Sequence, residues 1–372
     1  MKKKNFHPNR PHTTGSISQT GDQSLSTYNV GALPILNRVI DRAKIEAFLT
    51  QFLRLDKRCT ISPVVGTLVL LKNYLVSREP IYGVSEWACQ HATELLGLSP
   101  VQLSSLNDDR VGRCLDRLFE ADCPSLLLAI TRHVVEEFGL DLSELHNDST
   151  TITFFGDYEG ASKETRVLGK TAPAILWGHN KDHRGDLKQL LYNLTVTADG
   201  AVPVAFGVEN GNVTDDQTHI ANWELLCKVV GSVDFFYVAD SKLATHANLT
   251  YIAHRGGRFI SVLPGTRAED RDFRKKVLQG GVEWEEIDKQ YNDHGELVDT
   301  LSIVKEPATT SEGFRLLWYH STRKVEMDRA ERAKKIRRAF GSLSGLRLKV
   351  CSPRTRYHEE SQVAKAVDKR LE

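Results

Sequence analysis

Several features are missing from this 372-residue sequence, and each absence excludes a class of protein. Its six cysteines form no Cys-x-x-Cys pair, which argues against a zinc knuckle or a disulfide framework. The longest apolar stretch, residues 64–71, is interrupted by Gly66 and Thr67 and is too short to span a bilayer. No apolar segment follows the basic N-terminus, so we expect a cytoplasmic protein without a secretory signal or membrane contact.

The sequence also lacks a strong overall charge, since its formal net charge is +1. The charge is unevenly placed. Residues 314–372 contain 16 Lys and Arg against 7 Asp and Glu, which gives this segment a net charge of +9. Local fields of this kind attract anionic partners more effectively than the total charge indicates.

The N-terminal part predicts a tail and a helical domain. Residues 1–28 are polar, without apolar periodicity, and predict a mobile arm that either contacts DNA or is simply solvated. Residues 29–140 predict an all-α domain, with Asp41 and Asn107 as N-caps and Gly139 as a helix stop. The later helices are expected at about 62–76, 83–97, 107–121 and 124–138. The pattern leaves open whether this domain binds DNA or only packs and dimerises.

After Gly139 the pattern changes from helices to strands. We expect a core at residues 141–265 in which Asp199-Gly200 turns one strand into the next. Its predicted strands lie at about 142–155, 187–198, 202–209, 234–240 and 258–263, and its helices at about 216–230 and 243–255. This order of three strands, helix, strand, helix and strand is typical of a ribonuclease-H-like α/β fold, a mixed sheet in which an antiparallel hairpin continues into parallel strands.

Residues 266–350 do not continue this alternation of strands and helices. They predict a β-rich insertion with short strands at 301–304 and 314–320, followed by a basic helix at 323–340 that ends at Gly341. Residues 351–372 end within a helical pattern without a cap, and we expect them to be an incomplete C-terminal segment.

Two aspartates are the strongest candidates for chemistry. Asp148 lies within a strand-like segment, and Asp240 closes the apolar run 235–239. A carboxylate at the end of a buried strand is where sheet folds place ligands, although Asp148 alone also fits a turn or an edge strand. Carboxylates on neighbouring strands can share Mg²⁺, or Mn²⁺ in its place, so we predict that both residues are metal ligands for phosphodiester chemistry.

A basic loop between these aspartates is a candidate DNA contact. His179 and His183 have the spacing of a helical zinc pair, but the Glu of a His-Glu-x-x-His motif is missing, and Gly178 and Gly185 favour a loop. Ammonium and guanidinium groups suit phosphate binding. The alternative is a solvated surface loop. The predicted DNA-binding residues are Lys181, His183, Arg184 and Lys188.

Four segments together resemble the bacterial insertion-sequence DDE transposases, in the branch with a β-rich insertion. They are residues 147–152 (Asn-Asp-Ser-Thr-Thr-Ile), the loop 178–189, the turn 211–215 and residues 238–241 (Val-Ala-Asp-Ser). The resemblance covers most of the chain. It implies a retroviral-integrase-like fold, magnesium-dependent cleavage at transposon ends and strand transfer into target DNA by a homodimer. It also implies that Asp148 and Asp240 are the first two catalytic aspartates.

The third acidic residue of that family stands in a Tyr-x2-Arg-x3-Glu-x6-Lys signature. Here Tyr319 and Glu326 have the right separation, but Thr322 and Ala333 stand at the Arg and Lys positions. We therefore expect Glu326 to be outside the site and the chain to stop before its third acid, which would leave it without normal strand transfer. The alternatives are a non-catalytic DNA-binding remnant and a structure-specific nuclease on the same sheet.

Overall fold

The computed structural model describes residues 27–56, 58–162 and 166–371, so most of the predicted arm 1–28 lies outside the described residues. The chain divides into two compact units, Met1–Ser261 and Val262–Glu372, which are considered separately. No helix in the described ranges has the length and apolar character needed to cross a membrane.

The first unit begins with helices, as the sequence predicts. Val69 and Leu33 are fully buried at their centre, and Asn107 and Gly139 have the predicted roles, because the Asn107 side chain accepts from Arg110 N and Gly139 ends α8 with a φ of 62°. The helices are α1 (Leu33–Arg42), α2 (Ile45–Phe52), α3 (Pro63–Val76), α4 (Val84–Cys89), α5 (Thr93–Leu96), α6 (Pro100–Ser104), α7 (Asp108–Glu120) and α8 (Cys123–Phe138), with a short 3-10 turn at Ile81–Gly83.

Two details of the helical prediction are wrong. The helix expected at 83–97 is two short helices, because Asn29 pairs with the backbone at Gln90 and Ala92 and interrupts it. Asp41 is not an N-cap. Helix α1 continues to Arg42, and Lys44 turns the chain in the left-handed region with a φ of 51°.

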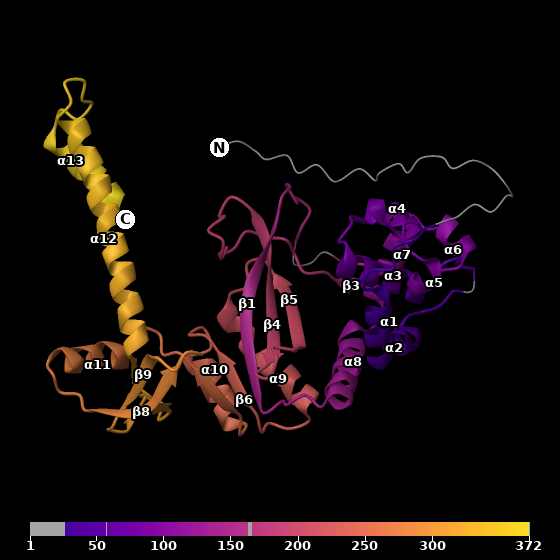
Figure 1. Ribbon diagram of the computed structural model, residues 1–372, viewed down its shortest axis with the longest axis horizontal. Helices are drawn as coiled ribbons and strands as arrows, with labels where there is room; N and C mark the ends of the chain where they lie inside the picture. Colours follow the sequence, from indigo (N-terminus) through magenta and orange to yellow (C-terminus); the bar gives the residue numbers. More distant parts are fainter. Residues whose placement is uncertain (1–26, 57, 163–165, 372) are drawn as a thin grey trace. The chain divides into compact units, whose positions relative to one another are not determined.

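A five-stranded mixed sheet follows, with the order β5-β4-β1-β6-β7. Strands β5, β4 and β1 are antiparallel, whereas β1, β6 and β7 are parallel. Each strand overlaps a predicted one, and Figure 1 shows the long β1, β4 and β5 side by side. The strands are β1 (Glu144–Phe154), β4 (Lys188–Thr197), β5 (Pro203–Asn210), β6 (Phe236–Ala239) and β7 (Arg258–Ser261).

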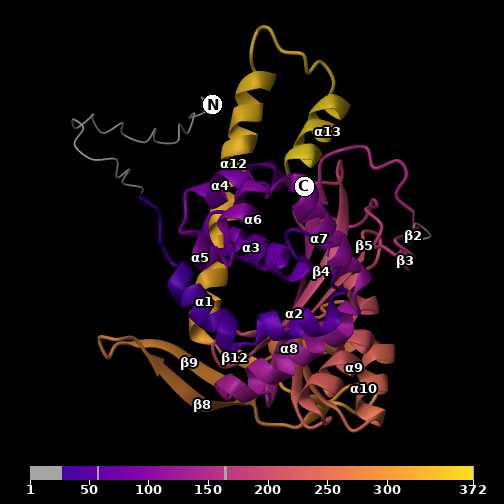
Figure 2. The same ribbon diagram turned by 90° about the vertical axis from the view of Figure 1, so that its right-hand side faces the viewer.

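Helices α9 (His219–Val230) and α10 (His246–His254) pack against one another beside the sheet (Figure 2). Strand alternation puts Leu145, Leu191 and Tyr237 on one face of the sheet, where they are buried, and the Tyr237 hydroxyl accepts a hydrogen bond from Asn222 of α9. The other sheet face carries Ile152 and Phe206, which remain exposed. A 3-10 turn, Asp215–Gln217, leads into α9, and a small hairpin of β2 (Arg166–Val167) and β3 (Lys170–Thr171) lies between β1 and β4 in the chain.

The second unit combines a short helix, small sheets and a long helical hairpin. Helix α11 (Ala268–Leu278) precedes β8 (Trp284–Tyr291) and β9 (Leu297–Val304), which form a three-stranded sheet with β12 (Tyr319–Ser321). Strands β10 (Ala308–Thr309) and β11 (Arg315–Leu316) form a separate pair. The last helices are α12 (Thr322–Val350) and α13 (Glu360–Leu371).

The predicted end of the basic helix at Gly341 is wrong, since α12 continues to Val350. Glycine disfavours a helix interior by about 1 kcal/mol. Packing offsets that preference, because Leu346 is buried and α12 also contacts α13.

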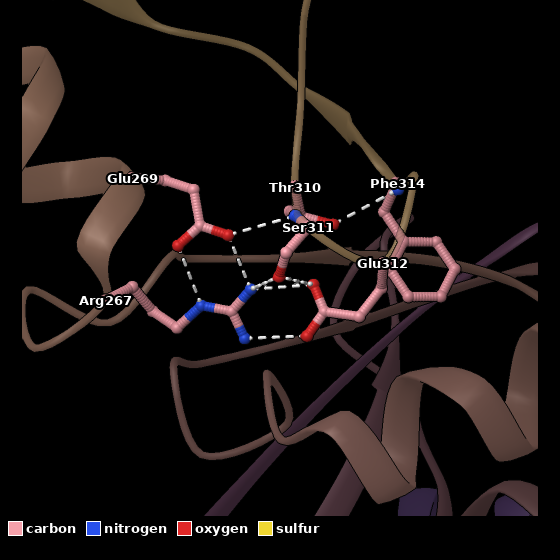
Figure 3. A network of polar contacts seen from close by, with 6 residues as sticks. All are labelled: Arg267, Glu269, Thr310, Ser311, Glu312 and Phe314. Carbon is pink, nitrogen blue, oxygen red and sulfur yellow. Dashed lines mark hydrogen bonds and ion pairs between the residues drawn. The ribbon is translucent and has the colours of Figure 1, made fainter.

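Arg267 connects the start of α11 to the β10–β11 turn (Figure 3). Its Nη2 atom lies 2.8 Å from Glu269 and 2.7 Å from Glu312, and Ser311 N donates to Glu269 at 3.1 Å. Hydrogen bonds from Arg267 lower the pKa of Glu269 to about 2 and also lower the pKa of Glu312. These three side chains are mostly buried, so the cluster joins two segments some 45 residues apart.

Candidate active site

Strand register places the two predicted catalytic aspartates side by side. Asn147 on β1 pairs with Ala239 on the adjacent parallel strand β6. Asp148 and Asp240 are the next residue in each segment, so both follow the last position at which β1 pairs with β6; β1 continues beyond Asp148, paired with β4. The prediction that they occupy neighbouring strands agrees with this register.

Both carboxylates are exposed and are oriented by nearby backbone N–H groups. Asp148 Oδ1 accepts from Ser149 N at 2.7 Å. Asp240 Oδ1 accepts from Lys242 N at 2.8 Å, and the Asp240 carbonyl accepts from Ser261 Oγ at 2.7 Å, which ties β6 to β7. Both carboxylates are therefore held in position by backbone hydrogen bonds and remain accessible to a metal ion from solvent.

A third carboxylate and a lysine complete the local charge pattern. Lys181 Nζ lies 2.9 Å from Asp215 Oδ2 and 4.0 Å from Asp148 Oδ1. It also donates to Ser149 Oγ at 2.8 Å and to the Ser149 carbonyl. The Asp215 side chain is 15% exposed, so its carboxylate is largely shielded from solvent. Among the ion pairs of the described residues, the positive charge nearest to Asp148 is therefore that of Lys181.

Buried polar side chains join the strands behind the aspartates. Asn147 Nδ2 donates to Thr195 Oγ1 at 3.1 Å, and Asn222 Nδ2 donates to Thr195 Oγ1 and to the Tyr237 hydroxyl, both at 3.0 Å. His219 Nδ1 lies 3.0 Å from the same hydroxyl. The network links β1, β4, β6 and α9, so it holds in place the parts of β1 and β6 that directly precede Asp148 and Asp240.

Burial sets the protonation of this network. It lowers the pKa of His219, against the opposing effect of Asp240, Asp215 and Asp216. It also raises the pKa of Tyr237. Both side chains are therefore neutral near pH 7 and act as hydrogen-bonding groups rather than charges.

The basic loop is held against β1 by Asn180 and Lys181. The buried Asn180 donates to Thr153 Oγ1 at 3.1 Å and accepts from Asp182 N, while Lys181 N donates to Thr151 Oγ1 at 3.2 Å. A Cβ atom at Gly178 would overlap the carbonyl oxygen of Gly211, so only glycine allows the loop to pass this close. The sequence prediction of a loop rather than a zinc-binding helix agrees with this structure.

The four predicted DNA-binding residues have different surroundings. Lys181 forms an ion pair with Asp215 and a hydrogen bond with Ser149. Lys188 Nζ donates to the carbonyls of Asp157 and Tyr158. Arg184 forms two hydrogen bonds with Asp186. Asp186 has a lowered pKa because of Arg184. His183 is exposed, with a φ of 58°. The loop therefore presents Arg184 and His183 outward, while Lys181 turns toward the carboxylates.

The donor set fits a hard cation with few protein ligands. In the described ranges no three His, Cys, Asp or Glu side chains come together as a metal-binding group. Mg²⁺ commonly uses only one or two carboxylates and keeps several waters, a pattern that the exposed oxygens of Asp148 and Asp240 match. The sequence analysis gave Asp215 no role. Asp215 does close the turn 211–215, one of the four segments that resemble the transposases, and that resemblance was a signal for it.

Comparison with known proteins gives limited matches. A domain of unknown function, DUF4277, matches residues 25–132, and no curated protein matches the chain. Among solved structures, a piggyBac transposase synaptic complex with hairpin DNA shares 11% identity over 78% of this chain and 59% of that chain, with a TM-score of 0.33. A Mos1 transposase paired-end complex with left transposon end shares 8% identity over 58% and 64%, with a TM-score of 0.22. The chain thus covers less than two thirds of each, and scores this low assign neither fold nor activity.

Proposed function

We propose that this chain is a DDE-type DNA transposase in which Asp148 and Asp240 form the catalytic pair. The observation that carries the proposal is the β1–β6 register, in which these two residues directly follow the last paired positions of adjacent parallel strands. The four segments that resemble insertion-sequence transposases support the same reading, since they lie at β1, the basic loop, the turn before α9 and the end of β6.

Asp148 and Asp240 would hold Mg²⁺, or Mn²⁺ in its place. The bound ion would supply Lewis-acid activation of the attacking oxygen and stabilisation of the leaving oxygen. In the first reaction the oxygen of water forms a bond to phosphorus at the transposon end as the bond to the departing 3′ oxygen breaks. In the second reaction the freed DNA 3′-hydroxyl attacks a phosphodiester of target DNA in the same way.

The basic loop would position the DNA beside the carboxylates. His183, Arg184 and Lys188 lie on one short segment, and Arg184 can exchange its exposed partner Asp186 for a phosphate at small cost. Lys181 would contribute from beside Asp148, where its charge also limits repulsion between the carboxylates and the phosphate. We propose that the active form is a homodimer that pairs two transposon ends.

The test is a plasmid that carries the DNA flanking the natural gene, incubated with the full chain and Mg²⁺. The proposal predicts strand breaks at the flanks and joined products, both lost in Asp148→Asn and Asp240→Asn. Asp293→Asn, which changes an exposed carboxylate between β8 and β9, serves as the control. Hydrolysis without joining would favour a nuclease, and binding without either reaction would favour a DNA-binding remnant, so both outcomes contradict the proposal.

The same assay decides the role of Glu326. We leave Glu326 out of the site because Thr322 and Ala333 occupy the Arg and Lys positions of the family signature. Joining that persists in Glu326→Gln agrees with this assignment. Joining that disappears in Glu326→Gln would make Glu326 the third acidic residue.

A further inference from the structure

Helix α7 carries a row of arginines on its outer face. Arg110, Arg113 and Arg117 have i, i+3 and i+7 spacing, so their side chains leave the same side of the helix. Val111 and Cys114, on the adjoining side of the helix, are buried. Cys114 packs directly on Gly66 of α3, because a Cβ atom at Gly66 would overlap the Cys114 sulfur. The arginine row is therefore held on a rigidly packed helix.

Two further arginines face this row from the segment between α2 and α3. Arg58, Arg110, Arg113 and Arg117 line a cavity of about 400 Å³. Arg54 joins Arg58 and Arg117 around an adjoining cavity of about 450 Å³. Since the two cavities share Arg58 and Arg117, they form one continuous surface, which we call the arginine cleft. Ile61, Pro63 and Cys114 contribute to its apolar lining.

The cleft has more guanidinium groups than carboxylates. Asp56 pairs with Arg58 at 2.9 Å, Glu120 pairs with Arg117 at 2.7 Å, and Arg110 donates to the Ser105 carbonyl at 2.7 Å. Asp116 is the other carboxylate in the lining, so five arginines face three acids. Within the described ranges, Arg54 and Arg113 have no ion-pair partner. Both are exposed and available to an incoming anion.

We propose that the arginine cleft binds phosphates of a DNA backbone. Planar guanidinium groups match phosphate oxygens in a forked geometry, and two facing rows can follow successive phosphates along a strand. The apolar floor suits the sugar edge between them. All five arginines lie inside the segment matched by the DUF4277 model, whose function is undefined. That the bound phosphates belong to DNA, rather than to another phosphodiester, rests on the proposed function. The anion site itself does not require Asp148 or Asp240.

The experiment measures binding of a fluorescein-labelled 30-base-pair duplex of random sequence to the full chain by anisotropy. EDTA is present throughout, so metal-dependent chemistry has no part in the signal. The test variant is Arg54→Ala with Arg113→Ala. The matched control is Arg38→Ala with Arg132→Ala, which removes two exposed arginines of the same helical domain outside the cleft. Thermal unfolding of both double variants verifies that the domain remains folded.

The test variant should bind the duplex about tenfold more weakly at roughly 100 mM salt, with a log–log salt slope smaller by about two, because two phosphate contacts are lost. The control should retain the wild-type slope. Equal affinity and slope in the two double variants would overturn the proposal. Loss of inorganic phosphate binding by calorimetry, with DNA binding unchanged, would also overturn it, since the cleft would then serve a free ion. Failure of the cleavage assay would leave this binding result intact, so the two proposals are separable.

Discussion

Lys181 Nζ and Asp215 Oδ2 lie 2.9 Å apart, and the same ammonium is 4.0 Å from Asp148 Oδ1. Asp215 thus holds a positive charge beside the first proposed metal ligand. The ammonium weakens the binding of a metal ion at Asp148, because two cations so close repel one another. The pair is therefore expected to tune metal affinity as well as loop position.

Replacing Lys181 with Met should strengthen Mn²⁺ binding about tenfold. A unit charge at 4 Å contributes roughly 4 kcal/mol at an effective dielectric constant near 20, and solvent around this one-third-exposed side chain reduces the effect to about 1.4 kcal/mol. Calorimetric titration of Mn²⁺ measures the change. Lys181→Arg keeps the charge and should remain close to wild type. Unchanged or weaker binding by Lys181→Met would show that the ammonium does not compete with the ion.

Gly178→Ala should displace the basic loop. Its new Cβ would overlap the Gly211 carbonyl oxygen and crowd the buried Gln189 side chain, so the loop must move away from Gly211 and β4. We expect a loss of stability of about 2 kcal/mol, together with faster proteolysis within residues 178–187. Gly185→Ala is the control in the same loop, because open space surrounds its Cβ position. Equal stability of the two variants would contradict the close approach.

The Arg267 cluster should make the second unit sensitive to acid. Arg267 holds the pKa of Glu269 at about 2, below its usual value near 4.3. A depressed carboxyl pKa stabilises the fold above the unfolded pKa, and this contribution is lost as the pH falls from about 4.5 toward 2. Arg267→Ala should lower stability at pH 7 by about 2 kcal/mol and flatten this acid dependence. Denaturant unfolding between pH 2 and 7 measures both, and a variant with an unaltered pH profile would exclude the cluster as the cause.

Helix α12 should contribute to DNA affinity through its unpaired basic residues. Arg329, Arg332, Lys335 and Arg338 are exposed, whereas Lys324 and Lys334 are paired with Asp328 and Glu331. Alanine at the four unpaired positions should reduce the salt slope of duplex binding by about three and a half, since each lost phosphate contact releases fewer counterions. Alanine at Lys324 and Lys334 should change it much less. Similar slopes for the two variants would argue against α12 as a DNA contact.

Local patterns in the sequence predict much of the sheet but not the contacts that complete the site. Alternating and apolar runs place every strand of the five-stranded sheet, and Asp199-Gly200 predicts its hairpin, where Gly200 has a φ of 79°. The pairing of Lys181 with Asp215 joins residues that are far apart in the chain, and no local period signals it. Likewise, Asn29 divides a predicted helix only because the folded chain brings it beside His91.

Residue preferences also mislead where tertiary packing is stronger. Gly341 predicts the end of the basic helix, yet α12 continues to Val350 because Leu346 is buried. Asp148 shows the opposite case. The sequence predicts the strand that contains Asp148 and the apolar strand that ends at Asp240. The predicted strand order then places these two strands next to one another.

The most direct test of the central claim is Mn²⁺ binding to the full chain, measured by electron paramagnetic resonance without DNA. If Asp148 and Asp240 jointly hold the ion, Asp148→Asn and Asp240→Asn should each weaken binding at least tenfold, because each removes one of two charged ligands. Asp186→Asn, in the exposed loop, should bind as wild type does. Wild-type Mn²⁺ affinity in both Asp148→Asn and Asp240→Asn would contradict the account.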